Sequence, residues 1–200
     1  MAPDAKLSEW ITGLAGKIPV WDEIMSFLCN DFFVPVVICL ILPTLWFWFS
    51  DPKKRERYQW AVMVTPSGIG FSSLFVWILN HVFNVDPWPR PWQALDNARE
   101  AADLLFYGPI DPSFPSNPAA MAFAAAAGIW FVNRKLAAFV CLLAILWSLA
   151  RVYCGAHYPL DIVAGAAIGI FVACLTRAFF RVIAPIPTLF LNILRRLYLA

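Results

Sequence analysis

The chain has 200 residues, of which 61% are hydrophobic and 14% are charged. Soluble domains carry about 25% charged residues, so this composition excludes an ordinary soluble protein and indicates an integral membrane protein. The formal net charge of +2 is too small to indicate binding to nucleic acid, and no nucleic-acid partner is expected. The five cysteines show no paired metal-ligand spacing, so neither a metal site nor a disulfide framework is expected.

The N-terminal segment, residues 1–31, mixes apolar residues with lysines and tryptophans. This composition is typical of helices that lie in the plane of the membrane interface. Because proline breaks a helix, we expect residues 7–30 to form one or two interfacial helices that are broken near Pro19.

Five apolar stretches follow, and a membrane-spanning helix needs about 20 such residues. The third stretch is short and rich in alanine. Small side chains let neighbouring helices approach closely, so we expect this helix to be central. Residues 32–182 are therefore predicted to form an all-α integral membrane bundle. The five predicted spans are residues 32–50, 58–83, 118–132, 136–153 and 160–180.

The last segment, residues 183–200, is interrupted by prolines and is predicted to be a second interfacial segment. Lysines and arginines gather on one side of the predicted bundle, which we expect to be cytoplasmic. The loop at residues 84–117 and the turn at residues 154–159 then lie on the extracytoplasmic side. The compact size favours a bacterial inner membrane. The basic residues are Lys53, Lys54, Arg55, Arg57, Arg134, Lys135, Arg177, Arg181, Arg195 and Arg196.

A polar run separates the last two predicted spans. Residues 150–161 read Ala-Arg-Val-Tyr-Cys-Gly-Ala-His-Tyr-Pro-Leu-Asp and include Arg151, His157 and Asp161. An arginine can bind an anion, a histidine can act as a nucleophile, and an aspartate can orient that histidine. Taken singly, the arginine also fits a headgroup anchor and the aspartate a residue favoured at a helix N-terminus.

Two more clusters lie on the same side of the predicted bundle. Arg90 stands between two tryptophans in residues 88–92, and these tryptophans are typical interfacial anchors. Ser116 and Asn117 occupy helix-capping positions, with Pro118 in the first turn of the third span. Two arginines, a hydroxyl and a helix N-terminus predict a phosphate-binding site. Asn117 is either a cap or a phosphate ligand in this interpretation.

Together these motifs resemble the three signatures of the type-2 phosphatidic-acid phosphatase superfamily. The run at residues 150–161 resembles the third signature. Residues 90–91 resemble the end of the first, and residues 115–116 resemble the start of the second. The motifs occur in the family's order, and the resemblance covers about residues 30–182.

The resemblance implies a core of six membrane helices, or five if the N-terminal helix lies on the surface. It also implies hydrolysis of membrane lipid phosphates or polyprenyl diphosphates without a metal or other cofactor. His157 is expected to attack the phosphorus and form a phosphohistidine, and Asp161 is expected to orient it. Arg90, Arg151 and Ser116 are expected to hold the phosphoryl oxygens.

The chain departs from the family's pattern at four positions, one of which is Asn117 in place of the second-signature glycine. Phe83 stands in place of the first-signature lysine, and Ala150 replaces the serine before the third-signature arginine. Pro118 replaces the histidine that protonates the leaving group. General acid catalysis is worth about 10²–10⁴-fold, and a lipid phosphate leaving from a diphosphate needs it less than an alkoxide. An active enzyme is therefore expected to use a diphosphate. His81 is an alternative proton donor.

Two functional hypotheses remain. The chain is either a lipid phosphatase that works through His157, or a catalytically inactive member that acts as a membrane subunit or anion-binding protein. In both cases the bilayer surrounds it, and either other membrane proteins or further copies of the chain are candidate partners. The joint retention of two arginines, the histidine and the aspartate favours the enzyme.

Overall fold

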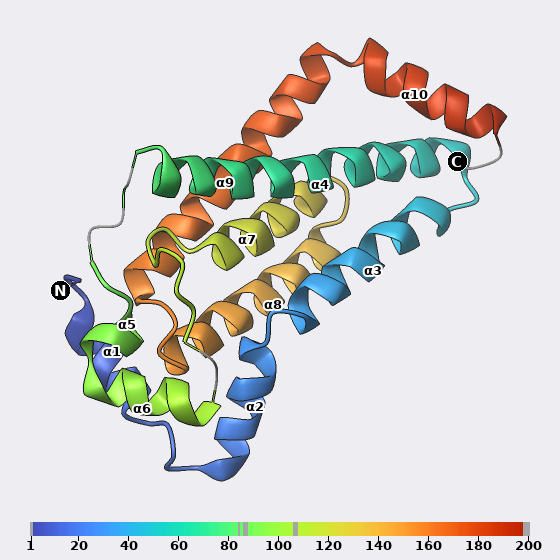
Figure 1. Cartoon of the computed structure of the whole chain (residues 1–200). Helices are drawn as coiled ribbons and strands as arrows, with labels where there is room; N and C mark the ends of the chain where they lie inside the picture. Colours follow the sequence, from blue (N-terminus) through green and yellow to red (C-terminus); the bar gives the residue numbers. More distant parts are fainter. Residues whose placement is uncertain (1, 84, 86–87, 106–107, 198–200) are drawn as a thin grey trace.

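The structure is a computed structural model and describes residues 2–83, 85, 88–105 and 108–197. Within these ranges all regular secondary structure is helical, as predicted (Figure 1). The described helices are α1 (Ala5–Thr12), α2 (Pro19–Cys29), α3 (Phe33–Phe47), α4 (Pro52–His81), α5 (Pro91–Ala94), α6 (Asp96–Leu105), α7 (Asn117–Trp130), α8 (Arg134–Tyr153), α9 (Pro159–Val182) and α10 (Pro185–Arg196).

The alanine-rich helix α7 lies at the centre of the bundle, as predicted. It packs against α4, α8 and α9, and most of its alanines are buried. A Cβ atom on Gly169 of α9 would lie 2.1 Å from the carbonyl oxygen of Ala120. A Cβ atom on Gly165 would lie 2.3 Å from the carbonyl oxygen of Ser116. The backbones of α7 and α9 are therefore in direct contact, which only small residues permit.

All five predicted spans fold as helices, but they differ in length. In the described chain, α4, α8 and α9 are each long and apolar enough to cross a membrane. Helix α3 meets that test only together with α2, from which it is bent by 53°. Helix α7 has 14 residues, so it is about 21 Å long, shorter than the roughly 30 Å hydrocarbon core. The predicted count of five spans is therefore not confirmed.

Short helices cover the end of the bundle where α9 begins (Figure 1). The N-terminal segment forms α1 and α2, and the break between them ends at Pro19, as predicted. The Asp4 carboxylate accepts a hydrogen bond of 2.6 Å from the backbone N–H of Leu160 in α9. The hydroxyl of Tyr153, at the end of α8, donates to Asp22 over 2.7 Å. Hydrogen bonds thus join the N-terminal segment to the start of α9 and the end of α8.

The connection predicted as a plain loop at residues 84–117 contains the helices α5 and α6. Helix α6 buries Ala98, Ala101 and Ala102, which lie three and one positions apart along the same face. This spacing is a helical pattern. The small size of the apolar residues and the charges around them make the pattern weak, which explains why the prediction missed it.

We predict that Gly169→Ala lowers the free energy of unfolding by about 1–3 kcal/mol, because the added methyl group overlaps the backbone of Ala120. The matched control is Gly70→Ala in α4, where an added Cβ meets nothing within 4 Å. Alanine has the higher helix propensity, so this control should gain up to about 1 kcal/mol. Denaturant unfolding in detergent micelles, followed by circular dichroism, measures both. Equal effects would contradict the close packing of α7 on α9.

Candidate active site

The polar run between α8 and α9 forms a tight turn. Helix α8 ends at Tyr153 and α9 begins at Pro159. Between them, Gly155 has a φ angle of 72°, and a Cβ atom there would lie 2.4 Å from the carbonyl oxygen of Ala98. Only glycine combines this conformation with so close an approach. The turn therefore packs tightly against α6, and His157 within it is 1% exposed.

The two ring nitrogens of His157 have different surroundings. Nδ1 lies 3.1 Å from the carbonyl oxygen of Ser113. Because a carbonyl oxygen only accepts hydrogen bonds, Nδ1 carries the proton. Nε2 is buried and has no hydrogen-bond partner among the described residues, so its lone pair points into the site unengaged.

The charge state of His157 follows from its burial. Burial lowers the pKa of His157 to about 4, against the opposing effect of Asp161. The positive charges of Arg90 and Arg151 lower this pKa further. A neutral imidazole is therefore the dominant form at pH 7, and it is the form that can act as a nucleophile.

The carboxylate of Asp161 is fully buried and joins three segments of the chain. Oδ2 accepts hydrogen bonds from the Ser113 hydroxyl (2.5 Å) and the backbone N–H of Tyr158 (2.8 Å). Oδ1 accepts from the Trp88 ring N–H (3.3 Å). The distance from Oδ2 to Nδ1 of His157 is 3.7 Å, longer than a hydrogen bond. Asp161 therefore acts on the imidazole through its charge and through Ser113.

Arg90 is 3% exposed and binds backbone carbonyls on two sides. Its Nε donates to the carbonyl oxygen of Asp111 (2.6 Å) and its Nη2 to that of Pro112 (3.1 Å). Its Nη1 donates to the carbonyl oxygen of Ala156 (2.6 Å), next to His157. The Asp111 carboxylate lies 3.1 Å from Nη2. Arg90 thus holds the segment before α7 against the turn that carries His157.

Arg151, in the last turn of α8, is 4% exposed. Its Nη1 contacts the carbonyl oxygen of Cys29 at 3.4 Å and forms an ion pair with Asp31. Its guanidinium carbon lies 5.8 Å from the centre of the Trp147 ring. Arg151 therefore ties the junction of α2 and α3 to the active-site end of α8. Each of the two predicted phosphate-binding arginines is paired with an aspartate in this structure.

The start of α7 has the predicted capping arrangement. The hydroxyl oxygen of Ser116 accepts a hydrogen bond of 3.4 Å from the N–H of Ala119. The backbone N–H of Ser116 donates to the carbonyl oxygen of Asp161 over 3.0 Å. Asn117 is the first helical residue, and its Oδ1 is buried without a hydrogen-bond partner in the described chain. The helix N-terminus is thus bonded directly to the segment that carries the buried carboxylate.

Two residues to which the sequence patterns gave no role in the site also hold it together. Ser113 uses its hydroxyl for Asp161 and its carbonyl for the histidine ring. Trp88 is predicted as an interfacial anchor, but its ring N–H donates to Asp161. The Trp88 ring also packs edge-on against Phe114 (5.3 Å) and Tyr158 (6.4 Å between ring centroids). Neither residue stands in a periodic pattern, so only its position in the folded chain identifies it.

The alternative proton donor, His81, lies elsewhere. It is the last residue of α4 and is exposed. Its Nδ1 lies 3.0 Å from the carbonyl oxygen of Trp77, and its ring stacks on the Trp77 ring at 4.9 Å. Among the residues that the structure describes, no hydrogen bond or ring contact joins His81 to His157.

The arrangement has a clear chemical capacity. It places an unprotonated imidazole nitrogen in a buried site where the charges of two guanidinium groups, those of Arg90 and Arg151, act on the ring. Such groups attract an anion and stabilise negative charge that develops during a reaction. The site therefore suits nucleophilic attack by His157 on the central atom of an anionic group.

Comparisons with known proteins find a matching family model and similar curated proteins. The family model described as the PAP2 superfamily matches residues 61–184. The undecaprenyl-diphosphatase BcrC of Bacillus subtilis is 26% identical over 94% of this chain and 88% of its own length. The putative undecaprenyl-diphosphatase YbjG of Escherichia coli is 26% identical over 83% of this chain and 76% of its own length.

Two solved structures are also similar. The crystal structure of Aquifex aeolicus LpxE superposes with a TM-score of 0.58 at 25% identity, covering 89% of this chain and 96% of that one. A PAP2-type phosphatidylglycerolphosphate phosphatase from Bacillus subtilis gives a TM-score of 0.56 at 18% identity, covering 88% and 85%. The second likeness concerns the fold alone.

The protonation state of His157 can be measured directly, because the chain contains only two histidines. The experiment uses protein labelled with ¹⁵N-histidine and carrying His81→Gln, so that only His157 gives a ring ¹⁵N NMR signal. We predict that His157 is neutral, with its proton on Nδ1, from pH 8 to about pH 5. Protonation should follow at a pKa of about 4, because burial disfavours the charged form. A midpoint near the ordinary histidine pKa of about 6.5, or a proton on Nε2, would contradict the described environment.

Proposed function

Because the chain belongs to the PAP2 superfamily, we propose that it is a membrane lipid phosphatase with His157 as its nucleophile. The observation that carries this proposal is the unpartnered, buried Nε2 of His157 beside two guanidinium groups. The similarity to undecaprenyl-diphosphatases over most of the chain supports a lipid diphosphate as the substrate. The retained Asp161 and Ser113 supply the support that a nucleophilic imidazole needs.

In the proposed reaction, the lone pair on Nε2 attacks the terminal phosphorus of the substrate. A new N–P bond forms while the bond from phosphorus to the bridging oxygen breaks, and its electron pair leaves with the lipid. The imidazole then carries a positive charge, with its proton still on Nδ1. The Ser113 carbonyl and the nearby charge of Asp161 stabilise this cation. Water subsequently hydrolyses the phosphohistidine and releases inorganic phosphate.

Arg90, Arg151, Ser116 and Asn117 are proposed to hold the phosphoryl oxygens. Asn117 stands at the start of α7 with its Oδ1 buried, and its amide N–H₂ is the group that would donate to a phosphoryl oxygen. The arginines are paired with carboxylates, so an incoming phosphate must either share those arginines or displace the acidic side chains. Arg90 also bonds three carbonyls, which gives it a positioning role in addition.

The substrate class follows from the leaving group. Pro118 stands in the first turn of α7, where the family's second signature places its proton-donating histidine. A lipid alkoxide needs that proton to leave, whereas a lipid phosphate departs as a stable anion. A polyprenyl diphosphate therefore suits this site better than a phosphate monoester.

The orientation in the membrane is proposed from the charges. The basic residues at the far end of the bundle favour a cytoplasmic location for that end, so the His157 site is proposed to face the extracytoplasmic side of the bacterial inner membrane.

A non-catalytic role is the second candidate. Two observations favour it: proline in place of the proton donor, and carboxylates already bound to both arginines. In that case the chain is a membrane subunit or anion-binding protein that has kept the fold. The two candidates differ in whether a covalent phosphoenzyme forms.

We predict that a polyprenyl diphosphate labelled in its terminal phosphate transfers the label to the chain, and that His157→Ala abolishes the labelling. His81→Ala is the matched control and should leave labelling unchanged, because His81 is exposed at the end of α4. Acid-quenched labelling followed by electrophoresis measures both variants. Absence of label on the wild-type chain, with stable copurification of other membrane proteins, would favour the non-catalytic role.

The leaving-group argument gives a separate prediction. The wild-type chain should release phosphate faster from a polyprenyl diphosphate than from phosphatidic acid. Pro118→His should raise the rate on phosphatidic acid by about 10²-fold or more, since general acid catalysis is worth that much, and raise the diphosphate rate less. Phosphate release under single-turnover conditions measures these rates. Faster turnover of the monoester by the wild-type chain would refute the argument.

A further inference from the structure

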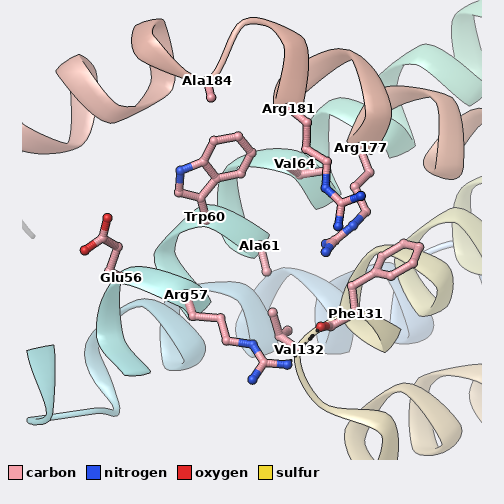
Figure 2. Close-up of a pocket in the computed structure, with 10 residues that line it drawn as sticks. All are labelled: Glu56, Arg57, Trp60, Ala61, Val64, Phe131, Val132, Arg177, Arg181 and Ala184. Atoms are coloured by element: carbon pink, nitrogen blue, oxygen red, sulfur yellow. Dashed lines mark hydrogen bonds between the residues drawn. The ribbon is translucent and has the colours of Figure 1, made fainter. Parts of the chain in front are cut away.

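A cationic cavity lies at the opposite end of the bundle from His157. It has a volume of about 300 Å³ and is bounded by α4, α9 and the turn between α7 and α8 (Figure 2). Arg181 in α9 follows Asp161 by 20 residues, which corresponds to about 30 Å along a helix. The two sites are therefore separated by roughly the thickness of a membrane core.

Three arginines line this cavity, and they come from two helices. Arg57, from α4, donates to the carbonyl oxygen of Phe131 over 3.1 Å. The guanidinium carbon of Arg177, from α9, lies 4.0 Å from the centre of the Phe131 ring. Figure 2 shows Arg177 and Arg181 side by side, with both guanidinium groups directed toward the interior near Ala61. The carbonyl oxygen of Phe131 thus holds Arg57, and the ring of Phe131 holds Arg177, at the same cavity.

The positive charge in the cavity exceeds the negative charge. Glu56 is the only acidic residue among those that line it, so three arginines and one glutamate leave a formal charge of +2. Glu56 lies on the other side of Trp60 from Arg177 and Arg181 in Figure 2. The Glu56 carboxylate oxygen also lies 3.8 Å from Nη2 of Arg195 in α10, a residue that does not line the cavity. The cations that converge near Phe131 are therefore not neutralised by the wall of the cavity.

The remaining lining is apolar and aromatic. Trp60 packs edge-on against Phe180 at 6.1 Å, which fixes its ring beside the cavity. Val64, Val132 and Ala184 complete an apolar wall next to the arginines. A tryptophan beside basic residues at a helix end is typical of the headgroup level of a membrane. A molecule bound in this cavity would therefore contact both the arginines and the apolar wall.

A general topology signal does not explain this arrangement. The excess of basic residues on one side of a membrane depends on their number near the helix ends, not on where they point. Lys53 and Lys54 supply that signal on the same helix without lining the cavity. Arg57, Arg177 and Arg181 instead line one partly open cavity, where each guanidinium can donate several hydrogen bonds to an oxyanion.

We propose that this cavity is a binding site for a phosphate group, distinct from the His157 site and independent of its chemistry. Arg57, Arg177 and Arg181 are its ligands. An anionic phospholipid and free phosphate both carry this group, and the apolar wall favours the lipid. Basic pockets between membrane helices bind lipid headgroups in the same way.

The test uses the full chain in neutral detergent with a photoactivatable phosphatidylglycerol, and peptide mass spectrometry locates the crosslinks. Labelling is expected at residues 56–64 and 131–132. Arg177→Gln with Arg181→Gln should reduce it by about tenfold or more, because charged hydrogen bonds are lost. The matched control, Lys53→Gln with Lys54→Gln, removes the same charge outside the cavity and should leave labelling unchanged.

Competition separates the sources of the phosphate group. Unlabelled phosphatidylglycerol should displace the probe, whereas diacylglycerol with the same acyl chains should not. Displacement by inorganic phosphate as well would assign the site to the free anion, and its failure would assign it to the lipid. Equal labelling of the arginine and lysine variants, or equal competition by diacylglycerol, would overturn the proposal.

A second variant, Glu56→Gln, tests the same proposal if the Arg177→Gln with Arg181→Gln variant does not fold. Glu56→Gln removes only an exposed ion pair, which contributes little to stability. It raises the formal charge of the lining, so labelling at residues 56–64 should increase. A decrease would contradict an anion site.

Discussion

The active-site end of the molecule depends on one buried charge, the carboxylate of Asp161. An unpaired carboxylate removed from water is strongly unfavourable, so its oxygens must be satisfied by hydrogen bonds. The donors come from three distant parts of the chain: Trp88, Ser113 and the backbone of Tyr158. Satisfying one carboxylate therefore brings together the segments before α5, before α7 and at the start of α9. The position of His157 is a consequence of that assembly.

The close contact of α7 with α9 provides the frame for this assembly. Because Gly165 and Gly169 let the two backbones touch, the N-terminus of α7 lies against the first turns of α9. Ser116 can then bond the carbonyl of Asp161 while it caps α7. Helix α7 is surrounded by other helices, so it does not need the length of a membrane span. Its composition can therefore be apolar although it has only 14 residues.

The arginines at the two ends of the bundle have different electrostatic surroundings. Near His157, Arg90 and Arg151 each face an aspartate, and these pairs offset the cost of burying the guanidinium groups. At the far end, Arg57 is oriented by a carbonyl and Arg177 by an aromatic ring, and neither contact cancels the charge of the arginine. The first arrangement neutralises part of the positive charge near His157, and the second leaves a net positive charge in the lining of the cavity.

The sequence alone determined the helical membrane class, the central place of α7, the Ser116 cap and the grouping of His157 with Asp161, because these follow from composition, local spacing and helix chemistry. It did not determine the number of spans. The neighbours of α7 bury that helix although it is shorter than a span, and α2 and α3 meet the test for a span only as a bent pair. Only the tertiary structure identified Ser113 and Trp88 as supports of the site and paired the arginines with Asp31 and Asp111. Those contacts join residues that lie 21 to 120 positions apart, so long-range packing, and not any local pattern, decides them.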